Sequence, residues 1–118
     1  MKHVVKVWGT EDWIVHCERY CGKRLTLQPG FQSSLHMHPI KDETFFVESG
    51  CCSLELEDEF GTIYRRTMLP GDRKRILPGR YHRFSLAGDA GEPCVILEVS
   101  TFHSDKDVCR REESRRIE

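Results

Sequence analysis

Short apolar runs that alternate with polar residues recur along the whole chain, and no long segment has a helical period. The runs are rich in β-branched and aromatic residues, and Gly, Pro and Asp interrupt them at regular intervals. This pattern predicts an all-β fold. We expect strands near residues 4–7, 13–18, 23–28, 34–38, 43–48, 52–57, 63–69, 73–76, 81–86 and 94–100.

The breaks between these runs have typical turn sequences, such as Pro29-Gly30, Pro70-Gly71 and Pro78-Gly79. Turn signals that recur with this spacing favour an antiparallel sandwich or barrel. The acidic segment 57–59, followed by Gly61, is expected at an exposed hairpin tip.

A chain of 118 residues fits one domain and can bury one core. We therefore expect a single domain over residues 1–118. Residues 1–15 are expected to form an N-terminal strand or dimer arm, and residues 105–118 form a highly charged tail. For that tail we expect a short helix or disorder.

Charge and targeting signals exclude several classes of partner. The 18 Lys and Arg residues nearly balance the 19 Asp and Glu residues, so nothing indicates a nucleic acid or an acidic membrane surface. No apolar stretch is long enough for a membrane span, and residues 1–6 do not have the pattern of a signal peptide. We expect a cytoplasmic protein whose 6 cysteines are reduced thiols, since no CxxC pair is present.

Two histidines separated by one residue, His36 and His38, lie in one predicted strand. Side chains two apart in a strand project from the same face, roughly 6.5–7 Å apart, so both imidazoles can tilt toward one ion. Glu43 opens the next predicted strand and can return its carboxylate to that ion. His82 lies among apolar residues, where a metal on one ring nitrogen satisfies a buried polar atom. These four side chains predict a site for one divalent metal ion.

The segments that contain these residues resemble the two motifs of the cupin superfamily. The first motif is Gly, five residues, His-x-His, three or four residues, Glu, six residues, Gly, and it matches throughout from Gly30 to Gly50. The second motif is Gly, five residues, Pro-x-Gly, two residues, His, three residues, Asn. Its matching positions are Gly71, Gly79 and His82, while Pro78 is displaced by one place and Leu86 replaces the Asn. The resemblance implies a cupin β-barrel, a double-stranded β-helix of the jelly-roll type.

Three imidazoles and one carboxylate suit several divalent transition metals, and the ligand types alone do not choose among them. We expect manganese first, with Zn, Ni, Co or Fe as alternatives. Four protein ligands leave two open positions on a six-coordinate ion, and a catalytic metal needs open positions.

Two further features resemble sugar isomerases. Lys41 stands two places before Glu43, and this spacing together with segment 98–110 resembles the D-lyxose ketol-isomerase family. The opening Trp8-Gly9, with an acid nearby, is similar to that of cupin phosphomannose isomerases. The resemblance implies an aldose–ketose isomerase that acts on a small sugar through an enediol.

In lyxose isomerases the matching Lys and Glu form the acid–base pair, so the resemblance gives these roles to Lys41 and Glu98. Glu98 shares a strand face with Cys94 and Ile96, which indicates an inward carboxylate. We expect an apolar barrel to raise the pKa of the carboxyl or to lower that of the lysine toward neutrality. The alternatives are an exposed turn lysine and a structural glutamate paired with an arginine.

Asp107 and Arg110 are candidate substrate-binding residues that would close the pocket or assist ring opening. The alternative for Asp107 is a charge of the tail or the rim. Trp8 and Trp13 are expected in the core or at an interface, although either can stack on a sugar.

Three other functions stay open on the sequence alone. They are an iron-dependent cupin dioxygenase, a non-catalytic metal- or sugar-binding cupin, and an isomerase or epimerase of phosphorylated sugars with Arg80 or Arg83 on the phosphate. We also expect a homodimer, because open sheet edges need cover, and segment 4–13 is the candidate contact.

Overall fold

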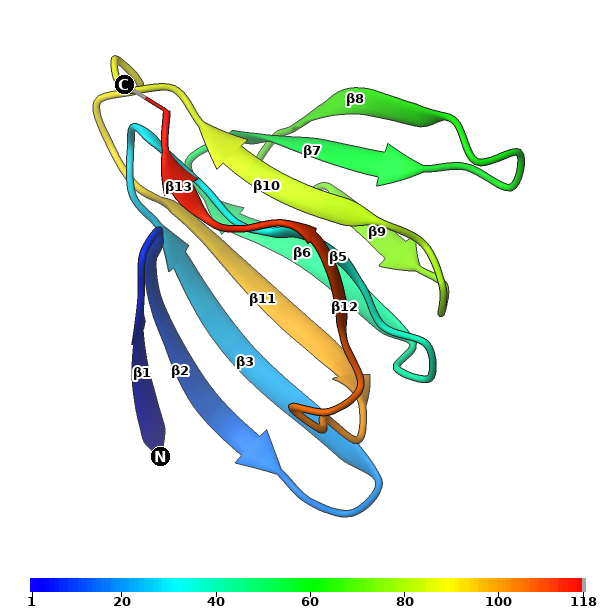
Figure 1. Ribbon diagram of the computed structural model, residues 1–118. Coiled ribbons are helices and arrows are strands. Elements are labelled where there is room, and N and C mark those ends of the chain that lie inside the picture. The colour runs from blue at the N-terminus through cyan, green and yellow to red at the C-terminus, as the bar shows by residue number, and fades with distance from the viewer. Residues whose placement is uncertain (118) are drawn as a thin grey trace.

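The computed structural model describes residues 1–117 as thirteen β-strands, with no helix in that range and therefore none that could span a membrane (Figure 1). The predicted all-β class is confirmed. The strands are β1 (Lys2–Lys6), β2 (Gly9–His16), β3 (Tyr20–Leu27), β4 (Phe31–Gln32), β5 (Leu35–Met37), β6 (Glu43–Ser49), β7 (Cys52–Glu57), β8 (Ile63–Met68), β9 (Arg73–Ile76), β10 (His82–Leu86), β11 (Cys94–Thr101), β12 (Cys109–Glu112) and β13 (Arg115–Arg116).

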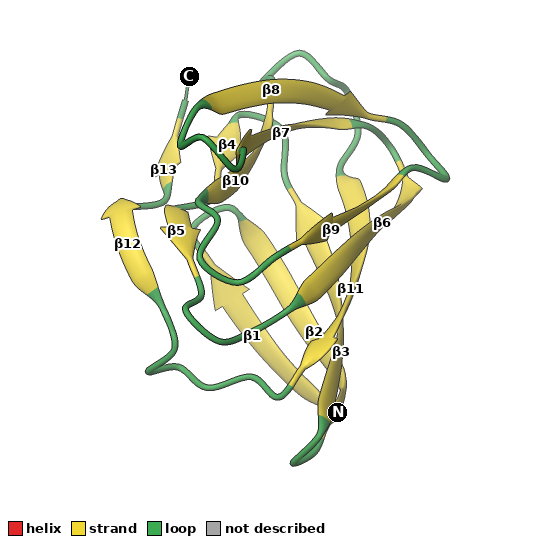
Figure 2. Ribbon diagram, turned by 90° about the vertical axis from the view of Figure 1, so that its right-hand side faces the viewer, coloured by secondary structure: helices red, strands yellow, loops and turns green. Residues whose placement is uncertain are grey.

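These strands form two antiparallel sheets that face each other around a common interior (Figure 2). The six-stranded sheet has the order β1-β2-β3-β11-β6-β9. The seven-stranded sheet has the order β12-β5-β10-β4-β13, with β7 beside β10 and β8 beside β7. Neighbours such as β3 and β11 are distant in sequence, so the sheets are built mainly from long-range pairings.

Period-two alternation decides which side chains enter the interior. In β7, Cys52, Leu54 and Leu56 are buried and the residues between them are only partly so. Phe45 of β6 and Phe84 of β10 meet edge to face at 4.7 Å between ring centroids, and this contact joins the two sheets. The remaining core is Trp8, Leu25, Leu27, Val47, Met68, Ile76, Leu86, Cys94 and Ile96.

Two glycines mark close approaches of the backbone. Gly50, between β6 and β7, has a φ of 71°, and a Cβ atom there would lie 2.4 Å from the carbonyl oxygen of Pro93. Gly9, at the start of β2, has a φ of 152°, and its Cβ would lie 1.8 Å from the carbonyl oxygen of Thr26. A larger residue at either position would therefore displace neighbouring backbone.

The expectation of helix or disorder in the charged tail is wrong over β12 and β13. β12 pairs with β5, and β13 pairs with β4. Both partners are very short strands beside β10, so the tail supplies hydrogen bonds on their second side. Side-chain charge does not prevent this, because all six residues of the two strands are exposed.

The N-terminal segment forms a hairpin within the chain. β1 pairs along its length with β2, from Lys2 opposite Trp13 to Lys6 opposite Gly9. β2 begins earlier than predicted because it also pairs with β3 from Gly9 onward. β1 is consequently an edge strand of the six-stranded sheet.

Candidate metal centre

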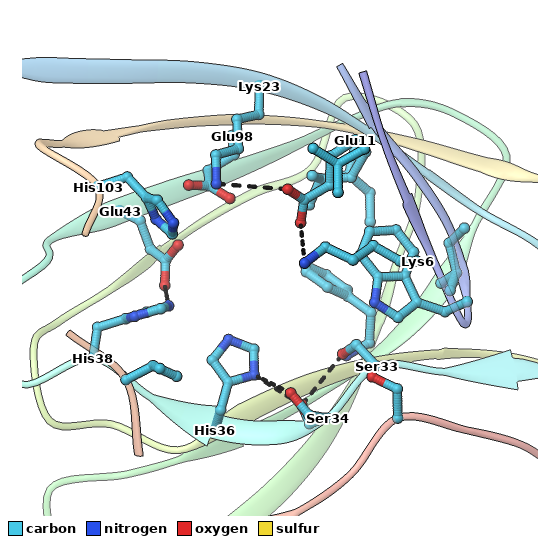
Figure 3. Close-up of a pocket in the computed structure, with 18 of the residues that line it drawn as sticks. Lys6, Glu11, Lys23, Ser33, Ser34, His36, His38, Glu43, Glu98 and His103 are labelled. Carbon is cyan, nitrogen blue, oxygen red and sulfur yellow. Dashed lines mark hydrogen bonds and ion pairs between the residues drawn. The ribbon is translucent and has the colours of Figure 1, made fainter. Parts of the chain in front are cut away.

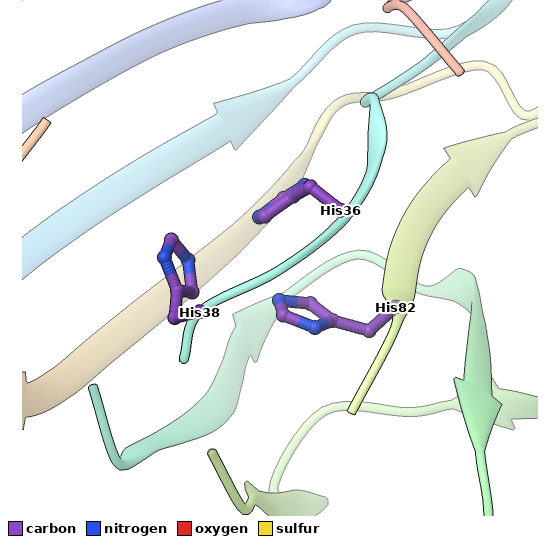
Figure 4. Close-up of side chains that lie close together, drawn as sticks. All are labelled: His36, His38 and His82. Carbon is purple, nitrogen blue, oxygen red and sulfur yellow. The ribbon is translucent and has the colours of Figure 1, made fainter. Parts of the chain in front are cut away.

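Three histidines from two neighbouring strands converge on one point. His36 lies in β5, His38 directly follows it, and His82 opens β10 opposite His36 in the antiparallel register. One ring nitrogen from each of the three lies within 4.8 Å of the others, and Figure 4 shows the rings gathered in this way. The predicted convergence of these three side chains is present, and the group is able to hold a metal ion.

Hydrogen bonds fix the tautomer of each ring. Each histidine places Nδ1 near a backbone carbonyl oxygen, which can only accept, so Nδ1 carries the hydrogen and Nε2 keeps a free lone pair. In metal-binding histidines the nitrogen that does not face the metal typically makes such a hydrogen bond. The carbonyl partners of His36, His38 and His82 are Ser34, Asp107 and Arg80, at 2.9, 2.6 and 3.0 Å.

Glu43, the first residue of β6, places a carboxylate beside this group. Its Oε2 lies 3.1 Å from Nε2 of His82 and 3.6 Å from Nε2 of His38. Oε2 of Glu43 and Nε2 of His82 are both buried without a hydrogen-bond partner among the described residues. Two lone pairs this close repel unless a proton or a metal ion lies between them, so the donor set fits a divalent metal. The geometry places Glu43 where the predicted fourth ligand belongs, and its role as a ligand stays a prediction.

The protonation states suit metal binding. Burial, assisted by His82, lowers the pKa of His36 to about 3, and burial also lowers the pKa of His38. Burial alone would raise the pKa of Glu43, but His82 and Lys41 outweigh it and lower that pKa to about 2. His36 and His38 are therefore neutral and Glu43 is ionised near pH 7, as ligands must be.

Lys41 and Glu98 form a buried ion pair next to the histidines. Nζ of Lys41 lies 3.1 Å from Oε2 of Glu98 and 3.5 Å from Oε1 of Glu43. Lys41 is only 3% exposed, so it is not a surface turn lysine. Burial lowers the pKa of Lys41, but the charges of Glu98 and Glu43 outweigh burial and raise it. The expectation of a lysine pKa near neutrality is wrong because two carboxylates surround the ammonium.

His103 belongs to the same group, and the sequence analysis did not single it out. Its Nδ1 lies 3.2 Å from Nζ of Lys41 and must accept, since an ammonium only donates. Its Nε2 then donates to Oδ1 of Asp105 at 2.9 Å. Burial and the charges of Lys23 and Lys41 lower the pKa of His103, which keeps the ring neutral. The only sequence signal was its place in the segment that resembles lyxose isomerases.

One cavity of about 600 Å³ contains all these side chains (Figure 3). That volume is typical of small-molecule sites. A second charged group, Glu11 with Lys6 and Lys23, lines the same cavity and was not predicted. The ammonium groups of Lys23 and Lys2 lie 4.1 and 4.3 Å from the Trp13 ring centroid, so this ring already has cationic partners.

The two candidate substrate-binding residues occupy different places. Arg110, in β12, lines the cavity. Asp107 lies outside the cavity lining, and its carboxylate oxygens accept hydrogen bonds from the backbone N–H groups of Ile40 and Lys41, at 2.9 Å each. Asp107 thus holds the loop that contains Lys41, while a contact of either residue with substrate stays a prediction.

The arginines considered for phosphate binding are not in the cavity lining. Arg83 is buried and pairs with Glu55 and Glu112, and the carbonyl group of Arg80 contacts His82.

All six cysteines are free thiols, of which Cys52 and Cys94 are buried neighbours.

The family of the chain follows from comparison with known proteins. A family model described as "Cupin domain" matches residues 23–100, which is more than half of the chain. This chain belongs to the cupin family. The predicted cupin fold is therefore confirmed, and β3 through β11 are the strands within the matched region.

Sequence relatives and solved structures similar to this cupin include enzymes with different activities. The mannose-1-phosphate guanylyltransferase 2 of Escherichia coli O157:H7 is 29% identical over 114 residues, which cover 95% of this chain and 22% of that protein. The D-lyxose/D-mannose isomerase of Thermosediminibacter oceani is 31% identical over 113 residues, covering 77% of this chain and 60% of that protein. Oxalate decarboxylase from Bacillus subtilis has a similar fold, with a TM-score of 0.79, 19% identity and coverage of 93% and 30%.

The predicted resemblance to sugar isomerases of the cupin type is thus confirmed at the level of distant homologues. The chain spans less than a quarter of the length of the first curated relatives that it matches. The structural likeness at 19% identity concerns the fold alone.

Proposed function

We propose that this cupin is a metal-dependent aldose–ketose isomerase that acts on a small sugar. The observation that carries the proposal is the buried Lys41–Glu98 pair, 3.1 Å apart, in one cavity with three histidines that are able to hold a metal ion. A charged acid and a carboxylate base beside a metal are the groups that proton transfer at a hydroxy-aldehyde requires. The relative named D-lyxose/D-mannose isomerase supports this choice of reaction.

In the first half of the reaction, the Glu98 carboxylate removes the proton from C2 of the open-chain aldose. The electron pair of that C–H bond forms the C1=C2 bond, and the π pair of the aldehyde forms a new O1–H bond with a proton from Lys41. The product of this step is the neutral enediol. The raised pKa of Lys41 suits this role, because the resting ammonium can then donate.

In the second half, the neutral amine of Lys41 takes the proton from O2 while Glu98 returns its proton to C1. The C1=C2 pair forms the new C1–H bond and the O2–H pair forms the C2=O bond, which gives the ketose. Both residues regain their starting states. His103 holds Lys41 throughout by accepting one of its hydrogen bonds at 3.2 Å.

His36, His38, His82 and Glu43 are the residues that would hold the metal. A divalent ion, for which manganese is our first choice, supplies Lewis-acid stabilisation of the substrate oxygens when bound. Glu43 lies 3.5 Å from Lys41, so the residues that would hold the metal have a fixed position relative to the proposed acid.

The experiment supplies the manganese-loaded protein with D-lyxose, D-mannose and D-ribose and measures the matching ketose. We expect turnover of at least one sugar, and a fall in kcat of about 100-fold or more for Glu98→Gln and for Lys41→Met. Glu59→Gln, at an exposed turn, is the control and should match the wild type. The proposal is overturned if no ketose forms, or if both variants retain full kcat with unchanged metal content.

Two rival functions give different results in the same experiment. Oxygen consumption with iron and no ketose with manganese would indicate a dioxygenase. Sugars that raise the melting temperature without any ketose would indicate a binding protein.

We also propose a homodimer. β1 is an edge strand; Val5 within it and Val7 directly after it are 76% and 60% exposed, which supports contact with a second copy. Light scattering during gel filtration tests this at micromolar concentration, where a monomer mass would contradict it.

A further inference from the structure

The cavity holds a second polar group that the proposed proton transfer does not use. Lys23 of β3 is 3% exposed, yet the nearest carboxylate oxygen, Oε1 of Glu11, lies 3.7 Å from its Nζ. This distance is too long for a hydrogen bond. Nζ also lies 4.1 Å from the ring centroid of Trp13, which orients the charge without accepting a conventional hydrogen bond. Among the residues that the structure describes, this ammonium with three donors thus has ion-pair and ring contacts only.

Glu11 of β2 has a carboxylate oxygen that can accept further hydrogen bonds. Its Oε1 accepts the Nε1–H of Trp13 at 2.9 Å, which fixes the orientation of the carboxylate. Its Oε2 has one cation nearby, Nζ of Lys6 at 4.0 Å, again beyond hydrogen-bond distance. An acceptor and a donor therefore stand side by side on the cavity wall, and each has hydrogen bonds left to make (Figure 3).

We infer that Glu11 and Lys23 form a binding subsite for the uncharged, hydroxylated end of the substrate, remote from its carbonyl. A hydroxyl group both donates and accepts, so adjacent hydroxyls can donate to Oε2 of Glu11 and accept from Nζ of Lys23. The inference rests on the proposed function for the nature of the ligand, a sugar. It adds the residues that select the sugar and the substrate class, a free rather than a phosphorylated aldose.

The carboxylate of the subsite favours a hydroxyl group over a phosphate. Lys2, Lys6 and Lys23 bring positive charge to this part of the cavity, but Oε2 of Glu11 needs a hydrogen-bond donor, which a hydroxyl group supplies and a phosphate dianion does not. Arg80 and Arg83, the arginines that might have bound phosphate, do not line the cavity. The subsite therefore matches hydroxyl groups better than it matches a phosphate.

Glu98 and Lys23 are carried by neighbouring strands, whose separation is close to the length of a small sugar. Lys23 lies directly opposite Glu98 across the β3–β11 pair, and Trp13 lies opposite Lys23 across the β2–β3 pair. Neighbouring strands are about 4.8 Å apart, which is close to the distance between the first and fifth carbons of an extended sugar chain. A carbonyl end at Glu98 thus places the last hydroxyls of a pentose or hexose at Lys23 and Glu11.

The test measures binding of D-arabinitol to the manganese-loaded protein by isothermal titration calorimetry. This polyol keeps the hydroxyls of a pentose but has no carbonyl, so its binding does not depend on turnover. Glu11→Gln and Lys23→Met should each raise Kd about tenfold or more, the usual effect of removing a charged hydrogen-bond partner. The exposed residues Glu59→Gln and Lys106→Met are the matched controls and should leave Kd unchanged.

Two results would overturn the inference. One is a Kd for D-arabinitol that neither Glu11→Gln nor Lys23→Met changes, with both variants folded by circular dichroism. The other is tighter binding of D-arabinitol 5-phosphate than of D-arabinitol, with the gain lost in Lys23→Met. A failed isomerase assay together with the expected loss of polyol binding would reject the catalytic proposal and leave the subsite standing.

Discussion

The carboxylate of Asp107 allows a direct test of how the fold holds the loop that contains Lys41. Its two carboxylate oxygens accept the backbone N–H groups of Ile40 and Lys41, each at 2.9 Å, and the residue is 9% exposed. Asp107→Ala leaves both N–H groups without this partner. Asp107→Asn retains one acceptor oxygen, so one of the two hydrogen bonds can persist.

The magnitude follows from the two contacts. A hydrogen bond to a charged acceptor contributes about 1.5–3 kcal/mol, so the alanine variant should lose at least about 3 kcal/mol of the free energy of unfolding. The asparagine variant should lose about half of that. A domain of this size has only about 5–15 kcal/mol in total, so the alanine change is large.

The assay is urea denaturation of the chelator-treated protein, followed by tryptophan fluorescence. Asp89→Ala, in the exposed loop before β11, is the control and should stay within about 0.5 kcal/mol of the wild type. The same variants should bind manganese about 10- to 100-fold more weakly, Ala more so than Asn. Without its carboxylate contacts the backbone at Asp107 is held less firmly, and its carbonyl oxygen accepts the hydrogen bond that orients His38. A stability loss below about 1 kcal/mol for Asp107→Ala would refute the reasoning.

Three further predictions concern the metal ligands and the thiols. The unfolded chain protonates a histidine at its ordinary pKa of 6.5 whereas folded His36 protonates at about 3, so the metal-free protein should lose stability as pH falls between these values. The slope is about 1.4 kcal/mol per pH unit for such a histidine, and urea titrations at several pH values should show it, reduced in His36→Asn. Manganese should raise the melting temperature of the wild type, and His82→Ala should abolish this rise in a thermal-shift assay. A thiol reagent should label exposed Cys51 in the folded protein but reach Cys94, which is fully buried, only on unfolding; equal labelling rates would contradict the packing.

Part of the candidate metal site was predictable because its geometry is local. His36 and His38 lie two residues apart in an extended segment, so strand periodicity alone directs both to one side, and Glu43 follows after one turn. His82 required the motif, because its approach to His36 depends on the pairing of β5 with β10. The same periodicity identified most of the strands from residue 20 to residue 101.

The rest of the cavity depends on pairings that the sequence does not reveal. Glu11 and Lys23 enter the site because β2 and β3 extend the sheet beside β11, and no local pattern marks that register. His103 meets Lys41 across a separation of 62 residues. The strands of the tail were missed for a related reason, since their charged side chains resemble those of a disordered segment while their backbones complete the edges of β5 and β4.

The position of Glu43 would give a bound metal ion a structural role as well as a chemical one. The three histidines belong to β5, β10 and the residue after β5 in the seven-stranded sheet, whereas Glu43 belongs to β6 in the six-stranded sheet. An ion bound by all four would therefore connect the two sheets at the cavity. Because the Lys41–Glu98 pair also joins the β5–β6 loop to β11, the proton-transfer groups and the ligand set keep their relative positions only while the sheets stay together. Metal affinity and catalytic geometry should consequently be lost together when the contact between the sheets is weakened, for example at Phe45 and Phe84.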